Sequence, residues 1–102
     1  MEEFKGSAGP WVAHDDEESM ATSVIMNDFG DILCVVGTYM TSAEEDFANA
    51  NLIAAAPELL EACLRLRNQL YAAGYESEEK SLNPTKDLLY QTEQAIDKAL
   101  GK

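Results

Sequence analysis

The sequence predicts an α+β fold in which a small antiparallel sheet of about three strands is followed by three helices. Short apolar runs bounded by turn residues fill residues 1–40, whereas from residue 42 to residue 102 the apolar residues recur at helical spacing. A chain of 102 residues can bury one core but not two. We therefore expect one domain over residues 1–102, β-rich over residues 1–40 and helical over residues 42–102.

Three strands are predicted in the first part: Trp11–His14, Ser23–Met26 and Ile32–Val36. The segment between the second and third strands reads NDFGD, which is turn chemistry with Gly30 able to adopt positive φ. This turn favours an antiparallel hairpin. A sheet this small is stable only when one face is covered, and we expect the helices to cover it.

Local signals place the three helices. Ser42 and Glu45 have the spacing of a capping box, which predicts a helix over Ala43–Ala55. Pro57 fits the first turn of a second helix, which runs to about Tyr71 before the cap residue Gly74. Asn83 and Pro84 begin a third helix, and the loop of roughly ten residues before it lets the last two helices form an antiparallel hairpin. On the first helix the expected apolar face comprises Phe47, Ala50, Ile53 and Ala54. On the second helix it comprises Leu60, Cys63, Leu64, Arg67 and Tyr71, and it is widened by Leu59, Leu66 and Leu70. On the third helix it comprises Leu88, Leu89, Thr92, Ala95, Ile96, Ala99 and Leu100.

The negative charge is concentrated in one part of the chain. Residues 1–62 contain 13 acidic side chains and one basic side chain, whereas residues 63–102 contain six of each. Such a surface repels phosphates, which argues against ordinary nucleic-acid binding and against anionic membranes. The densest acidic run, residues 14–18, is expected to be a solvated loop. Adjacent residues in a flexible loop do not hold a defined coordination geometry, so we expect no metal site there. There is no apolar run of about 18 residues and no apolar signal-peptide core, so we expect a cytoplasmic protein.

The sequence offers little for catalysis. Its single histidine, His14, could pair with Cys34 as nucleophile and base, but nothing in the sequence brings them together. Cys34 and Cys63 are expected to be small buried apolar residues in a reducing compartment. We therefore expect no enzyme activity, no cofactor and no metal.

A few residues are candidates for ligand binding. Arg65 and Arg67 can recognise a phosphate or can pair with acids such as Glu61. Asn49 lies in an alanine-rich helix, where it can bond to a ligand or locally to the protein. Trp11 can anchor the core or stack on a base.

Two further motifs stand out: Gly9-Pro10-Trp11 and the stretch NANLIAAAPELLEA from Asn49 to Ala62. With these motifs the chain resembles small phage and prophage proteins over roughly residues 9–66. The family typically reads GPW, a few strands, then NARLIAAAPELLEAL, and this chain has Asn51 in place of its arginine. Part of the pattern resembles the Thoeris anti-defence proteins of phages. Those proteins have an N-terminal antiparallel sheet and C-terminal helices, form homodimers or higher homo-oligomers, and sequester cyclic ADP-ribose-type signals without cleaving them.

The resemblance implies a non-enzymatic counter-defence protein in the cytoplasm of the infected cell that sequesters a small signalling nucleotide. Under this hypothesis Trp11, Phe47 and Asn49 contact base and ribose, and Arg65 or Arg67 contacts phosphate. A homodimer is expected through the small-residue helix or the C-terminal hairpin. The acidity leaves a second hypothesis open, in which the protein mimics DNA or antagonises a basic host protein. A phage accessory role remains a third.

Overall fold

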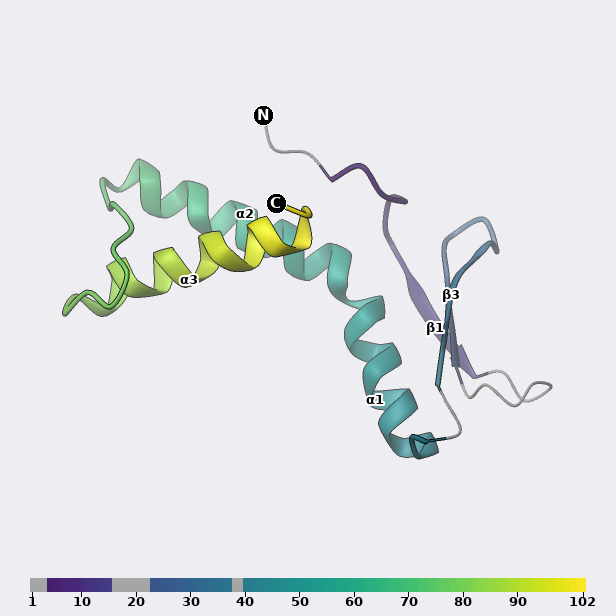
Figure 1. Cartoon of the computed structure of the whole chain (residues 1–102). Helices are drawn as coiled ribbons and strands as arrows, with labels where there is room; N and C mark the ends of the chain where they lie inside the picture. Colours follow the sequence, from purple (N-terminus) through teal and green to yellow (C-terminus); the bar gives the residue numbers. More distant parts are fainter. Residues whose placement is uncertain (1–3, 16–22, 38–39) are drawn as a thin grey trace. The chain divides into compact units, whose positions relative to one another are not determined.

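Three strands and three helices follow one another along the chain in the computed structural model, which describes residues 4–15, 23–37 and 40–102. Contacts divide the chain into two compact units. We call Gly6–Glu58 the sheet unit, and Leu59–Lys102 together with Phe4 and Lys5 the hairpin unit. The elements are β1 (Val12–Asp15), β2 (Ser23–Met26), β3 (Ile32–Val36), α1 (Ala43–Ala54), α2 (Ala56–Ala72) and α3 (Pro84–Ala99) (Figure 1). The predicted α+β fold class is confirmed.

The sheet is antiparallel, with β2 between β1 and β3. The predicted turn joins β2 to β3: the Asn27 side-chain oxygen accepts hydrogen bonds from the backbone N–H groups of Phe29 and Asp31, both at 3.0 Å, and Gly30 has φ +83°. The register pairs Ile25 with Cys34 but Met26 with Ile32. Leu33 is therefore an extra residue in β3, and the strand contains a β-bulge that the sequence analysis did not predict.

The core of the sheet unit lies between one face of the sheet and α1, which contacts all three strands (Figure 1). Its buried centre is Ile25, Val36 and Ala50. Alanine at the centre of the α1 face lets the helix backbone come close to the strands. Half-buried side chains packed around this centre are Trp11, Ala13, Leu33, Cys34, Ile53 and Ala54.

The start of α1 is held by two side chains. Ser42 is the N-cap and accepts a hydrogen bond from the Glu45 backbone N–H at 3.1 Å, as predicted. Asp46 in the first turn is buried, with 3% of its surface exposed, and its carboxylate accepts a hydrogen bond from the Thr41 hydroxyl at 2.5 Å. A carboxylate in the first helical turn is also favoured by the helix dipole. The burial of Asp46 was not predicted.

The two motifs that carry the phage resemblance meet in the sheet unit. A Cβ atom placed on Gly9 would lie 2.9 Å from the Pro57 Cβ atom, so only glycine fits this contact without a shift. Trp11, two residues later, packs against the core that also receives Ile53 and Ala54. The motifs therefore have a structural role, because they join the entry of the first strand to the junction between α1 and α2.

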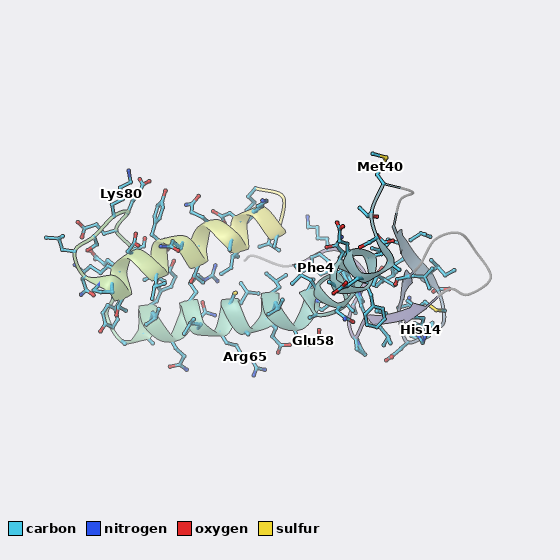
Figure 2. The ribbon with its side chains drawn as sticks, turned by 90° about the horizontal axis from the view of Figure 1, so that it is seen from below. Phe4, His14, Met40, Glu58, Arg65 and Lys80 are labelled. Atoms are coloured by element: carbon cyan, nitrogen blue, oxygen red, sulfur yellow. The ribbon has the colours of Figure 1, made fainter. Side chains whose placement is uncertain are left out.

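The hairpin unit consists mainly of α2 and α3, which lie side by side and antiparallel in both views (Figures 1 and 2). Gly74 ends α2 with φ +91°, and the Tyr75 N–H donates to the Leu70 carbonyl at 3.0 Å. Asn83 caps α3 by accepting from the Thr85 N–H at 3.0 Å. The Tyr71 hydroxyl donates to the Glu93 carboxylate and ties the two helices together.

Several predicted positions need correction. The first strand is Val12–Asp15, one residue later than expected, because Trp11 turns into the core before the ladder begins. Cys34 and Cys63 are free thiols that are half-buried instead of buried. Some residues assigned to buried helical faces are exposed, because each helix turns only a narrow stripe towards its partner. They are Phe47, Leu59, Leu66, Tyr71, Leu88, Ala95 and Ala99.

Candidate functional site

The face of the sheet opposite α1 is apolar except for His14 of β1. Side chains alternate between the two faces of a strand, so Val24 and Met26 of β2 lie opposite the core residue Ile25. The ladder pairs them with Val35 and Ile32 of β3 and with His14 and Val12 of β1. We call Val12, Val24, Met26, Ile32 and Val35 the open sheet face.

This face is accessible at its edges. Val24 in its middle is buried, but Ile32 and Val35 are 60% and 59% exposed, and Val12 is also exposed. Among the described elements of the sheet unit, the single helix α1 packs on the other face. Neighbouring large apolar side chains that are exposed in this way are typical of an interaction site.

The lysine, arginine and carboxylate charges of the sheet unit are of one sign. The sheet unit contains ten acidic residues and neither lysine nor arginine. Of these, Asp28, Asp31, Glu44, Glu45 and Glu58 are exposed. Two of them, Asp28 and Asp31, stand in the β2–β3 turn at the end of the open sheet face. Residues 16–18 of the loop predicted over residues 14–18 lie outside the described residues. A partner with positive charge would complement this unit.

The residues predicted to hold base and ribose lie in the sheet unit in three different settings. Trp11 is half-buried against the core, and its indole N–H donates to the Ser7 carbonyl at 3.2 Å. Phe47 is 46% exposed on α1, and Asn49 is exposed two positions later. Positions two apart point about 200° apart around a helix. Phe47 and Asn49 therefore lie on opposite flanks of α1.

The predicted phosphate ligands are both on α2. The Arg65 guanidinium is 2.8 Å from the Glu61 carboxylate, with 79% of the arginine side chain exposed, and it projects away from α3 (Figure 2). Arg67 is half-buried, donates to the Asn68 side-chain oxygen, and lies 5.8 Å from the centre of the Tyr71 ring. Arg65 thus has the local ion pair that the sequence analysis offered as the alternative to ligand binding.

The family described as Salmonella phage P22 protein Y8K6 matches residues 1–102, the whole chain. The chain belongs to this family. No curated protein and no solved structure is measurably similar to the chain. Membership in the P22 Y8K6 family confirms the prediction of a phage protein.

The described residues of this Y8K6 family protein contain neither a metal-site cluster nor a membrane-spanning helix. Over residues 4–15, 23–37 and 40–102, no three histidine, cysteine or acidic side chains come together in the manner of a metal site. In the same part of the chain, no helix has the length and apolar character needed to span a bilayer.

The sequence analysis missed the open sheet face as a feature of this Y8K6 family protein. Ile32–Val36 is apolar at every position, and such a run predicts a strand buried on both faces. The alternation that would mark one exposed face is therefore absent. Three helices were expected to cover the sheet, whereas among the described elements α1 alone packs on it.

Proposed function

We propose that this phage protein is a non-enzymatic counter-defence factor that binds a basic host protein through the open sheet face. One observation carries the proposal: an exposed apolar strand surface lies in a unit with ten acidic residues and no lysine or arginine. Apolar contacts at the centre supply affinity, and the surrounding charge selects a cationic partner and speeds its association. The counter-defence role rests on the resemblance to phage anti-defence proteins.

Capture from a Salmonella lysate tests this proposal when it is combined with matched variants. The double variant Ile32→Lys, Val35→Lys places two positive charges on the open sheet face, at exposed positions of an edge strand where lysine is well tolerated. The control Leu82→Lys makes the same change at a fully exposed leucine of the hairpin unit. We expect one captured protein to be retained by wild type and control and lost by the double variant.

The captured protein is then purified and its affinity measured at rising salt. Exposed charges are screened beyond about 10 Å at 0.1 M salt, so the dissociation constant should rise steeply with ionic strength. A captured protein that binds the double variant equally well, or whose affinity is insensitive to salt, contradicts the proposal.

Nucleotide sequestration is a second candidate. Its specific support is Arg65, whose side chain is 79% exposed and whose ion pair with Glu61 is also exposed. Such a pair contributes only about 0.2–1 kcal/mol, so the arginine can exchange Glu61 for a phosphate at little cost. The same hypothesis assigns nucleotide contacts to Trp11, Phe47 and Asn49 of the sheet unit and to Arg67 of the hairpin unit.

A melting-temperature panel of cyclic nucleotides and cyclic ADP-ribose isomers distinguishes the two candidates. A ligand at 100 times its dissociation constant adds about 2.7 kcal/mol of stability. Under sequestration, one compound raises the melting temperature, is recovered intact, and loses its effect with Asn49→Ala or Arg65→Ala. A panel without any shift leaves protein binding as the function.

A further inference from the structure

The α2–α3 hairpin encloses only a small core. No residue of α2 is buried, and α3 buries only Leu89 and Ile96. The side chains of α2 that are half-buried beyond its first turn are Leu60, Cys63, Leu64, Arg67 and Leu70, and they form one narrow stripe. Two helices alone offer little depth, and antiparallel hairpins of this kind complete a core by packing against further helices.

A second apolar stripe on each helix remains exposed. On α2 it comprises Leu59, Ala62 and Leu66, and the two leucines are 49% and 53% exposed. On α3 it comprises Leu88, Ala95 and Ala99. We call these six residues the open hairpin face.

Both exposed stripes lie on the same side of the hairpin. Leu59 and Leu66 each come one position before a half-buried residue of α2, and Leu88 and Ala95 each come one position before a buried residue of α3. One position is a rotation of about 100° around a helix. Because the two helices run in opposite directions, the same rotation brings both stripes to one side.

The charges along α2 identify the partner of this face. The acidic residues Glu58 and Glu61 stand in its first half, and Arg65 and Arg67 stand in its second half. Of these, Glu58 and Arg65 are seven positions apart, so they lie on the same edge of α2, each one position before a residue of the exposed stripe. An antiparallel copy of the same helix therefore places Glu58 beside Arg65 of the other copy at both ends. Leu59–Lys102 as a whole is nearly balanced, with seven acidic and six basic residues, so two copies meet there without the repulsion expected between two sheet units.

We propose that two copies of the chain pack their open hairpin faces together as a symmetric four-helix bundle, with α2 antiparallel to its counterpart. Leu59 of each copy then meets Leu66 of the other, and Glu58 of each copy lies beside Arg65 of the other at the edge of the contact. Such an isologous contact closes at two subunits.

Sedimentation velocity of the full-length chain over a concentration series tests the proposal. We expect a dimer for wild type, a shift of at least tenfold towards monomer for Leu66→Glu, and no shift for the control Leu82→Glu, which makes the same change at the fully exposed leucine. A monomeric wild-type chain, or a dimer unaffected by Leu66→Glu, overturns the proposal.

A charge exchange tests the predicted antiparallel pairing directly. The variant Glu58→Arg has a basic α2 edge, and Arg65→Glu has an acidic one. Each alone should be monomeric because like charges face each other, and their equimolar mixture should form a heterodimer. Circular dichroism melts first establish that each variant is folded. Folded variants that dimerise alone, or a mixture that stays monomeric, contradict the antiparallel pairing.

Discussion

Two serines of the sheet unit differ in the hydrogen bonding of their hydroxyl groups. Ser42 caps α1 through its bond to the Glu45 N–H. Ser23 is fully buried, and its hydroxyl has no hydrogen-bond partner among the described residues. A buried hydroxyl without a partner costs about 1–3 kcal/mol, whereas a capping serine stabilises its helix by about 1 kcal/mol.

Replacing each serine by alanine should therefore change stability in opposite directions. We expect Ser23→Ala to raise the free energy of unfolding by about 1 kcal/mol and Ser42→Ala to lower it by a similar amount. Urea denaturation followed by circular dichroism measures both. A loss of stability with Ser23→Ala would mean that its hydroxyl has a partner after all.

Gly9 should tolerate no side chain. A Cβ atom there would lie 2.9 Å from the Pro57 Cβ atom, which belongs to a rigid ring. Overpacking of this kind costs about 1–3 kcal/mol, so Gly9→Ala should lower the urea midpoint. Ala8→Ser, one residue earlier, is the matched control. An unchanged midpoint for Gly9→Ala would show that the turn moves aside freely.

This contact also shows what the sequence could reveal at the residue scale. The GPW and AAAP motifs were recognisable as unusual, but their mutual contact was not, because it joins segments more than 40 positions apart. The same limit applies to Asp46, whose burial depends on tertiary packing. The ion pair of Arg65 lies within one helical turn, and it was foreseen.

At the scale of single elements, local signals predicted the structure well. The caps Ser42 and Asn83, the turn around Gly30 and the end of α2 at Gly74 all occur as expected. Each depends on hydrogen bonds or backbone angles within a few residues, so the sequence contains the whole cause. Which flank of a helix meets its neighbour depends on the partner. Hence Leu59 and Leu66 were placed in the buried face incorrectly.

The cap of α3 provides a test at this scale. Asn83→Ala removes the acceptor for the Thr85 N–H and should lower stability by about 1 kcal/mol. Asn83→Asp keeps an acceptor and adds a negative charge at the helix N-terminus, so it should match wild type or exceed it. Thermal melts of the three proteins measure the difference. Equal losses in both variants would mean that the amide group has another role.

For the whole molecule, the uneven charge was visible in the sequence, but its coincidence with a compact unit was not. The sheet unit takes all its strands and α1 from the stretch that lacks lysine and arginine. The open sheet face could not be predicted from the sequence either, because it depends on which helices pack on the sheet. The proposed nucleotide residues were chosen one at a time by chemistry, and chemistry alone does not indicate which side of α1 a residue occupies.

Self-repulsion within the sheet unit makes stability depend on salt. The Debye length falls from about 30 Å at 0.01 M to about 10 Å at 0.1 M, so added sodium chloride screens the ten acidic residues from one another. A gain of about 1 kcal/mol raises the melting temperature by roughly 4–8 °C in a domain of this size. We expect a rise of this order in calorimetry. A melting temperature that falls with salt would mean that attractive pairs dominate.

The absence of lysine and arginine from the sheet unit has a practical consequence. Trypsin cuts only after these two residues, so even the unfolded chain yields Gly6–Arg65 as one uncut peptide. Reagents and enzymes that attach to lysine amines find their targets only at Lys5, Lys80, Lys86, Lys98 and Lys102. Coupling through lysine amines therefore attaches the protein to a sensor surface without modifying any residue of Gly6–Glu58.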